Sequence, residues 1–101
     1  MKEFNSLGEI IDCSEDEFRE YCSDKNVGYL TNLHNLMVQT YNHTSETNKA
    51  LVAKVSIMKK GSEEFIEAVS TLNGLFSKLL RIEQRVFIIR ELIDKLNKVE
   101  N

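Results

Sequence analysis

An apolar side chain recurs every three or four positions from Phe65 to Leu96. This spacing predicts one long amphipathic helix over about residues 62–99. The chain contains no proline, so no ring removes a backbone donor or clashes with the preceding turn along this stretch. We call the residues of this repeat the predicted seam and expect them to contact other helices: Phe65, Val69, Leu72, Phe76, Leu79, Ile82, Val86, Ile89, Ile93 and Leu96.

A second helix is predicted over about residues 28–60. Its seam is Leu30, Leu33, Met37, Thr40, Thr44, Thr47, Leu51, Val55 and Met58, at mostly alternating steps of three and four. Threonines replace large apolar residues in the middle of this seam. The stretch Asn42–Asn48 is also poor in strong helix formers, so a break there remains an alternative.

The residues Lys59-Lys60-Gly61 are typical of a helix C-terminus, and Ser62 followed by Glu63 and Glu64 is typical of a helix start. The chain is therefore predicted to reverse near Gly61, which makes residues 27–101 a long helical hairpin of coiled-coil type. The pair Asn73-Gly74 also favours a turn, so a reversal at Gly74 is the alternative.

The first 26 residues differ from the rest in charge and pattern. Residues 1–13 show no strong periodicity and are expected to be irregular, with one short amphipathic stretch of Phe4, Leu7, Ile10 and Ile11 as the alternative. Ser14 and Glu17 form a capping box, which predicts a short acidic helix within residues 14–26. The sequence thus predicts an all-α protein, with a short N-terminal helix followed by the hairpin. Residues 1–26 carry a net charge of -5 and residues 27–101 a net charge of +2.

Composition argues against several functional classes. Neither part of the chain is basic enough to indicate a nucleic-acid binder. No apolar run approaches the ~20 residues that cross a bilayer, and the N-terminus lacks the apolar core of a signal peptide. No glycine-rich phosphate loop or polar constellation indicates an enzyme or a cofactor. We therefore predict a non-enzymatic, cytoplasmic protein without catalytic, cofactor-binding or metal-binding residues.

The remaining reactive side chains are interpreted in the same way. His34 and His43 are too far apart in sequence for a close helical ligand pair and are predicted to be ordinary surface or interface residues. Cys13 and Cys22 form no CxxC pair and are predicted to be packed thiols. Lys78, Arg81 and Arg85 share one side of the long helix. That side is predicted to be a solvated face that pairs loosely with acids of a partner, with phosphate or acidic lipid as the alternative.

Several local patterns in residues 29–100 resemble the family of subunit 2 of the lysosome-related-organelle biogenesis complex, a subunit shared with a related complex on lysosomes. The residues concerned are Tyr29-Leu30-Thr31, Tyr41, Asn48-Lys49, Met58-Lys59, Leu72-Asn73 and Ile82-Glu83-Gln84-Arg85-Val86. The last segment follows after about one heptad fewer than in that family. The resemblance implies extended helices, no catalytic residues, and a role in positioning endosomes and lysosomes as a peripheral subunit of a hetero-oligomer.

The long helices also argue for partners. A helix of ~38 residues is ~57 Å long, and two such helices leave one side of each broad apolar stripe in water. Our leading hypothesis is a non-catalytic scaffold subunit of a hetero-oligomeric complex, with other helical subunits as partners. The alternative is a small homo-oligomeric helical-bundle regulator, of phage or bacterial type, that binds another protein.

Overall fold

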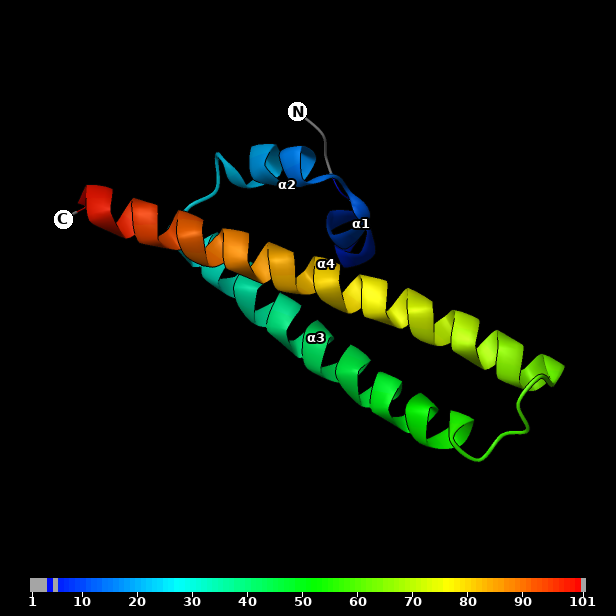
Figure 1. Cartoon of the computed structure of the whole chain (residues 1–101). Coiled ribbons are helices and arrows are strands. Elements are labelled where there is room, and N and C mark those ends of the chain that lie inside the picture. Colours follow the sequence, from blue (N-terminus) through cyan, green and yellow to red (C-terminus); the bar gives the residue numbers. More distant parts are fainter. Residues whose placement is uncertain (1–3, 5, 101) are drawn as a thin grey trace.

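The predicted helical hairpin is confirmed. The computed structural model describes Phe4 and residues 6–100, which form four helices and, over these residues, no strand. Figure 1 shows two short helices, α1 (Leu7–Asp12) and α2 (Glu15–Cys22), followed by two long ones, α3 (Val27–Val55) and α4 (Glu63–Glu100). The long helices run antiparallel beside each other, and α1 and α2 pack against α4.

Each short helix begins at a serine that caps it. The Ser14 hydroxyl accepts a hydrogen bond from the Glu17 backbone, and the Glu17 carboxylate accepts one from the Ser14 backbone, so the predicted capping box is confirmed. Ser6 caps α1 by accepting from the backbone N–H of Glu9. The expected irregularity of residues 1–13 is therefore wrong for Leu7–Asp12, which are helical; positions 1–3 and 5 lie outside the described residues.

Helix α3 begins after Asn26, whose side chain accepts a hydrogen bond from the Tyr29 backbone N–H at 2.8 Å. It continues without a break through Asn42–Asn48. The hydroxyl of Thr47 donates to the carbonyl of His43, four residues earlier, which satisfies this polar group inside the helix. Thr44 is buried, so a small polar residue occupies part of the contact with α4.

The chain reverses between α3 and α4, as predicted, and Gly61 lies in the connection with a φ of 86°. Only glycine adopts this left-handed region readily. Helix α3 ends at Val55 rather than near Lys60, so Lys59 and Lys60 lie in the connection and not in a last helical turn. The hydroxyl of Ser62 accepts from the Phe65 backbone N–H, which starts α4 where the sequence predicted. The alternative reversal at Gly74 is wrong, because α4 is helical there.

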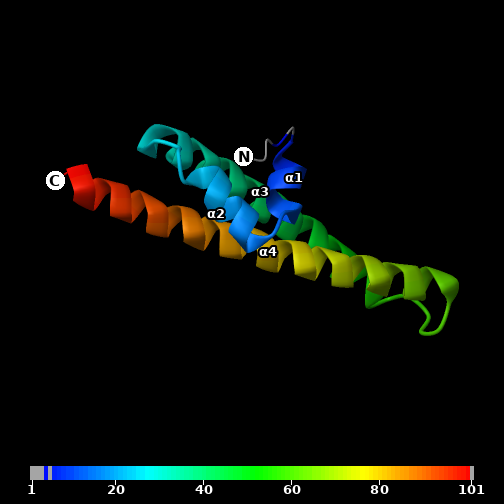
Figure 2. The same ribbon diagram turned by 90° about the horizontal axis from the view of Figure 1, so that it is seen from above.

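The core lies near the open end of the hairpin, where α1 and α2 cover α3 and α4. Figure 2 shows that the closed end with its connection extends well beyond the two short helices. The buried apolar cluster consists of Ile10, Ile11, Cys13, Phe18, Cys22, Leu30, Leu33, Met37, Ile82, Ile88 and Ile89. All four helices contribute to this cluster, so the N-terminal helices are integral to the fold.

Among the helices of the described residues, none combines the length and apolar character needed to cross a membrane.

Candidate functional site

The predicted seam of α4 is divided between the interior and the surface. Leu79, Ile82 and Ile89 are buried. A further six residues are half-buried: Phe65, Val69, Leu72, Val86, Ile93 and Leu96. Phe76 is 51% exposed and lies on the surface of the chain. Within the monomer, most of this seam packs inside the hairpin, so it is not a free surface.

A different set of α4 residues forms the exposed apolar surface. Leu80 is 68% exposed, Phe87 71% and Ile66 60%. Leu80 follows Ile66 by two heptads and precedes Phe87 by one, so the three share one side of the helix. Including the heptad positions between them, this outer seam consists of Ile66, Val69, Asn73, Phe76, Leu80, Glu83 and Phe87. Large exposed apolar side chains aligned in this way mark an interaction site.

Helix α4 presents different residues to its neighbours. The buried Leu79, Ile82 and Ile89 belong to the side that packs within the hairpin. Arg81 and Arg85 reach the N-terminal helices, and Ile88, three residues after Arg85, shares their side. The exposed residues of the outer seam occupy the remaining side, and the half-buried Val69 lies at its edge. Ile66 and Leu80 are not part of the predicted seam, and the seven-residue repeat that they form with Phe87 is the sequence signal that could have identified this separate face.

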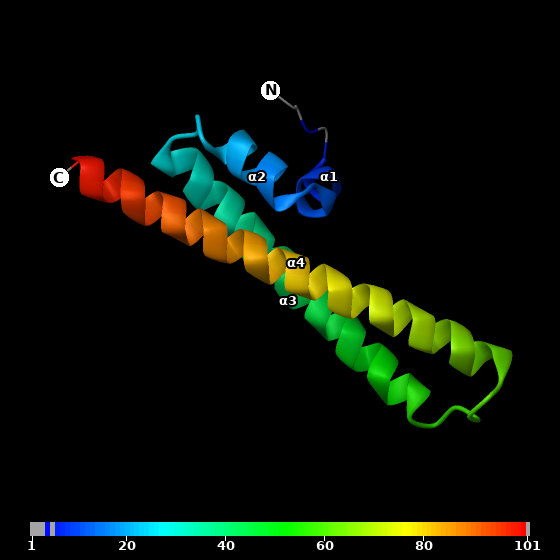
Figure 3. The same ribbon diagram turned by 45° about the horizontal axis from the view of Figure 1, so that its top comes forward.

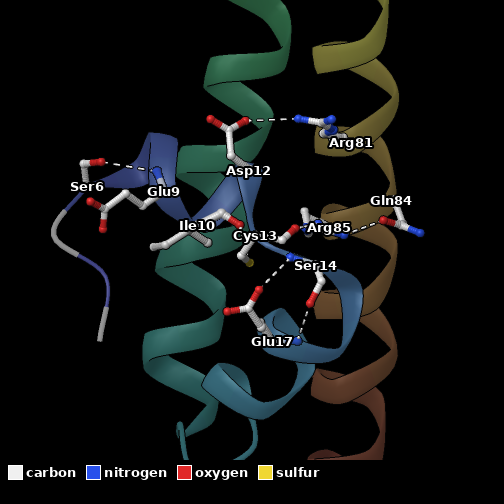
Figure 4. A network of polar contacts seen from close by, with 10 residues as sticks. All are labelled: Ser6, Glu9, Ile10, Asp12, Cys13, Ser14, Glu17, Arg81, Gln84 and Arg85. Atoms are coloured by element: carbon white, nitrogen blue, oxygen red, sulfur yellow. Dashed lines mark hydrogen bonds and ion pairs between the residues drawn. The ribbon is translucent and has the colours of Figure 1, made fainter. Parts of the chain in front are cut away.

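Arg85 joins the N-terminal helices to α4. It is only 3% exposed. Figure 4 shows its guanidinium beside the carbonyl of Cys13, to which Nη2 donates a hydrogen bond, and beside the side chain of Gln84. The guanidinium also lies 5.2 Å from the centre of the Phe18 ring, a cation–π contact. The prediction that Arg85 belongs to a solvated face is therefore wrong, because its partners belong to the same chain.

Arg81 remains on the surface, but its partner is also within the chain. Its Nη1 lies 3.3 Å from a carboxylate oxygen of Asp12 in α1, as Figure 4 shows. A second cross-pair joins Arg19 in α2 to Glu91 in α4 at 3.2 Å. The two cross-pairs have opposite polarity, because the acid belongs to α1 in the first pair and to α4 in the second.

Both cysteines are buried thiols that form no disulfide, as predicted for packed thiols. The thiol of Cys13 donates to the carbonyl of Ile10 at 3.0 Å. Burial raises the pKa of the Cys22 thiol to about 11. A thiol in this state is a poor nucleophile near neutral pH, because the reactive thiolate is scarce.

Aromatic and basic side chains gather where α2 meets α3. The hydroxyls of Tyr21 and Tyr29 are hydrogen-bonded, and the amine of Lys25 lies 4.6 Å from the centre of the Tyr21 ring. Burial and, next, the hydrogen bond with Tyr29 raise the pKa of Tyr21. The Phe4 ring meets the Tyr21 ring edge to face at 4.9 Å. These contacts hold the α2–α3 connection in place.

The histidines have no common site. Nε of Arg90 donates to Nε2 of His34 at 3.0 Å, which links α4 to α3, and His43 is exposed. In the part of the chain that the structure describes, no group of three histidine, cysteine or acidic side chains is placed to hold a metal ion.

Shallow hollows follow the junction of α3 and α4. One of about 280 Å³ is lined by Val38, Tyr41, Glu83, Val86 and Arg90. A hollow of about 910 Å³ lies at the closed end of the hairpin, beside Ile57, Met58 and Lys59. The larger hollow is also lined by Lys54, Ser62, Glu63 and Glu64, and most of these side chains are exposed. Exposed charged side chains on an open surface do not form the enclosed, mostly apolar pocket that is typical of small-ligand sites. The smaller hollow has only Glu83 and Arg90 as charged groups. The outer seam of α4 is therefore the strongest candidate for a functional surface.

Comparison of the chain with models of known protein families, with curated proteins and with solved structures gave no match in any of the three.

Proposed function

We propose that this protein is a non-catalytic scaffold subunit that assembles with other helices through the outer seam of α4. The observation that carries the proposal is the exposure of Leu80 and Phe87, which are 68% and 71% exposed although the chain buries a complete apolar cluster elsewhere. Fully burying one such side chain contributes roughly 1.5–3 kcal/mol. A partner helix on this face therefore supplies the burial that the monomer lacks.

The finer form of the proposal is a subunit of a hetero-oligomeric complex that positions endosomes or lysosomes. Its support is the sequence resemblance over residues 29–100 alone. The hairpin departs from the extended helices that this resemblance implies, because the chain reverses between Val55 and Glu63. Assembly through the outer seam does not depend on this finer assignment.

The assembly is tested by recovering tagged protein from its native source and comparing wild type with a Leu80→Asp, Phe87→Asp double variant. Both side chains are exposed in the monomer, so the double variant should stay folded and lose its associated subunits, because two charges would be buried at the contact. The matched control is Val52→Asp, which changes an exposed valine of α3. If the double variant is recovered with the same associated subunits as the wild type, in an assembly of the same mass, the proposal is contradicted.

A further inference from the structure

The outer seam of α4 contains two polar positions that restrict what can cover it. Asn73 and Glu83 interrupt the apolar residues of a regular heptad repeat. A polar residue at such a position selects register and partner, because it is tolerated only opposite a group that satisfies it. This inference rests on the proposed function and concerns the identity of the partner helix.

The positions of the outer seam from Val69 to Phe87 are symmetric about Lys78. Phe76 and Leu80 lie equally far from it, as do Asn73 and Glu83. Val69 and Phe87 form the next symmetric pair. When two copies of a helix pack antiparallel about a twofold axis, residues equally far from the axis lie at the same level on opposite chains. With the axis at Lys78, each Asn73 therefore meets Glu83 of the other copy, and every apolar residue from Val69 to Phe87 meets an apolar residue.

Charge excludes the parallel arrangement of two copies. In a parallel pair each residue meets itself, so Glu83 would face Glu83 of the other copy. Like charges buried together are strongly unfavourable. In the antiparallel pair the carboxylate of Glu83 instead accepts a hydrogen bond from the amide of Asn73, a charge-assisted contact.

We propose that the outer seam binds a second copy of this chain, with the two α4 helices antiparallel and crossing at the level of Lys78. The sides of α4 toward α3 and toward the N-terminal helices are already covered, as the views in Figures 1 and 2 show. The outer side carries the exposed Ile66, Asn73, Phe76, Leu80 and Phe87, and Glu83 lies at its edge, where it lines a hollow with Val38 and Tyr41 of α3. Ser77 lies one residue from the level of Lys78, at the edge of the outer seam. The product is a bundle with four long helices, two from each copy.

Two charge variants at one position distinguish the antiparallel pair from a parallel pair. Asn73→Lys places an ammonium opposite Glu83 of the other copy and should strengthen dimerisation or leave it unchanged. Asn73→Glu places a second carboxylate there and should weaken it by about tenfold or more. In a parallel pair both variants place like charges together, and both should weaken it. Sedimentation equilibrium of the full-length proteins measures these dissociation constants.

Cross-linking provides an independent measurement. In the antiparallel pair the two Ser77 residues lie at nearly the same level along the helices. Each Asn73 is level with Glu83 of the other copy, ten residues further on, so the two Asn73 residues are ~15 Å apart along the helix direction. Ser77→Cys should therefore give a covalent dimer with a short bis-maleimide, and Asn73→Cys should not. The wild type, with its two buried cysteines, is the control.

Light scattering of the purified wild type should give twice the mass of one 11.7 kDa chain. A monomer at all concentrations, together with no covalent dimer from Ser77→Cys, overturns the second copy as occupant. Efficient cross-linking of Asn73→Cys in place of Ser77→Cys overturns the antiparallel arrangement. If the wild type alone is monomeric while the Leu80→Asp, Phe87→Asp variant loses its native-source subunits, only this inference fails. If the variant also retains those subunits, the proposed function fails as well.

Discussion

At the scale of single residues, Arg85 shows how a charged side chain can belong to the core. Its guanidinium is buried between the Cys13 carbonyl, Gln84 and the Phe18 ring, and its Nε atom has no hydrogen-bond partner. A buried cation of this kind is costly unless its remaining donors are satisfied. Arg85 therefore holds the α1–α2 junction on α4 at the cost of one unmade hydrogen bond.

Replacing Arg85 by alanine should lower the free energy of unfolding by about 2–3 kcal/mol, because the Cys13 carbonyl loses its charged donor and the Phe18 ring loses its contact. The matched variant Arg81→Ala removes an exposed ion pair with Asp12 and should cost less than about 1 kcal/mol. Urea denaturation followed by circular dichroism measures both. Equal losses for the two variants would mean that burial of Arg85 contributes nothing.

The thiol of Cys22 gives the protein a dependence on alkaline pH. Burial raises its pKa from 9.0 to about 11, so the unfolded chain loses this proton first as the pH rises. Its stabilising contribution is complete below pH 9.0 and is lost between 9.0 and about 11. The loss should amount to about 1.4 kcal/mol for each unit of pKa shift.

Urea titrations at several alkaline pH values measure this dependence, and Cys22→Ala is the control that should remove it. Tyr21, whose pKa is also raised by burial and by its bond to Tyr29, contributes with the same sign at higher pH, so Tyr21→Phe is a second control. An identical alkaline decrease in the Cys22→Ala variant would assign the effect to other groups.

At the scale of helices, two glycines with opposite backbone requirements test the path of the chain. Gly61 has a φ of 86°, whereas Gly74 lies inside α4, with open space where a Cβ atom would project. Gly61→Ala should destabilise the protein by about 1 kcal/mol, because alanine is strained at that φ. Gly74→Ala should stabilise it by up to about 1 kcal/mol, since alanine favours a helix. Thermal melts of the two variants should shift in opposite directions. A stabilising Gly61→Ala would place the reversal elsewhere.

The features that could be predicted from the sequence are those that depend on residues close together in the chain. The capping box of Ser14 and Glu17, the start of α4 at Ser62 and the reversal near Gly61 each depend on residues a few positions apart, so local chemistry determines them. The early end of α3 was missed. Beyond Val55 the backbone N–H groups of Ile57 and Met58 bond to carbonyls three residues earlier rather than four. No single residue type in this stretch predicts that the helix tightens and ends there.

Long-range contacts could not be predicted in this way. The carbonyl that Arg85 contacts lies 72 residues earlier in the chain, and helical periodicity contains no information about it. The same limit applies to the candidate site. The apolar spacing identified α4 as the contact helix. However, only the packing of α3, α1 and α2 separated the inner residues, such as Ile82 and Ile89, from the outer Leu80 and Phe87.

At the scale of the whole molecule, the fold is elongated, with a radius of gyration of 17.0 Å and extents of 58 × 25 × 17 Å. A compact domain of ~100 residues has a radius of gyration of ~13 Å. The N-terminal helices cover only the open end of the hairpin, so the outer side of α4 and the closed end remain in water. An elongated shape with an apolar stripe along one side favours lateral association, since the contact can run along the helix.

Association of this kind should couple stability to protein concentration. If two copies bury the outer seams together, unfolding releases two chains, and mass action raises the melting temperature as concentration rises. We expect a rise of about 3 °C for each tenfold increase in concentration. The Leu80→Asp variant should melt at a temperature independent of concentration, because Leu80 is exposed in the monomer and its replacement affects only the assembled state. Val52→Asp should keep the wild-type dependence. Calorimetry over a hundredfold range of concentration measures all three proteins. A wild-type melting temperature that does not change over this range would mean that the folded chain is stable by itself, and that the apolar stripe of α4 is covered by a different protein.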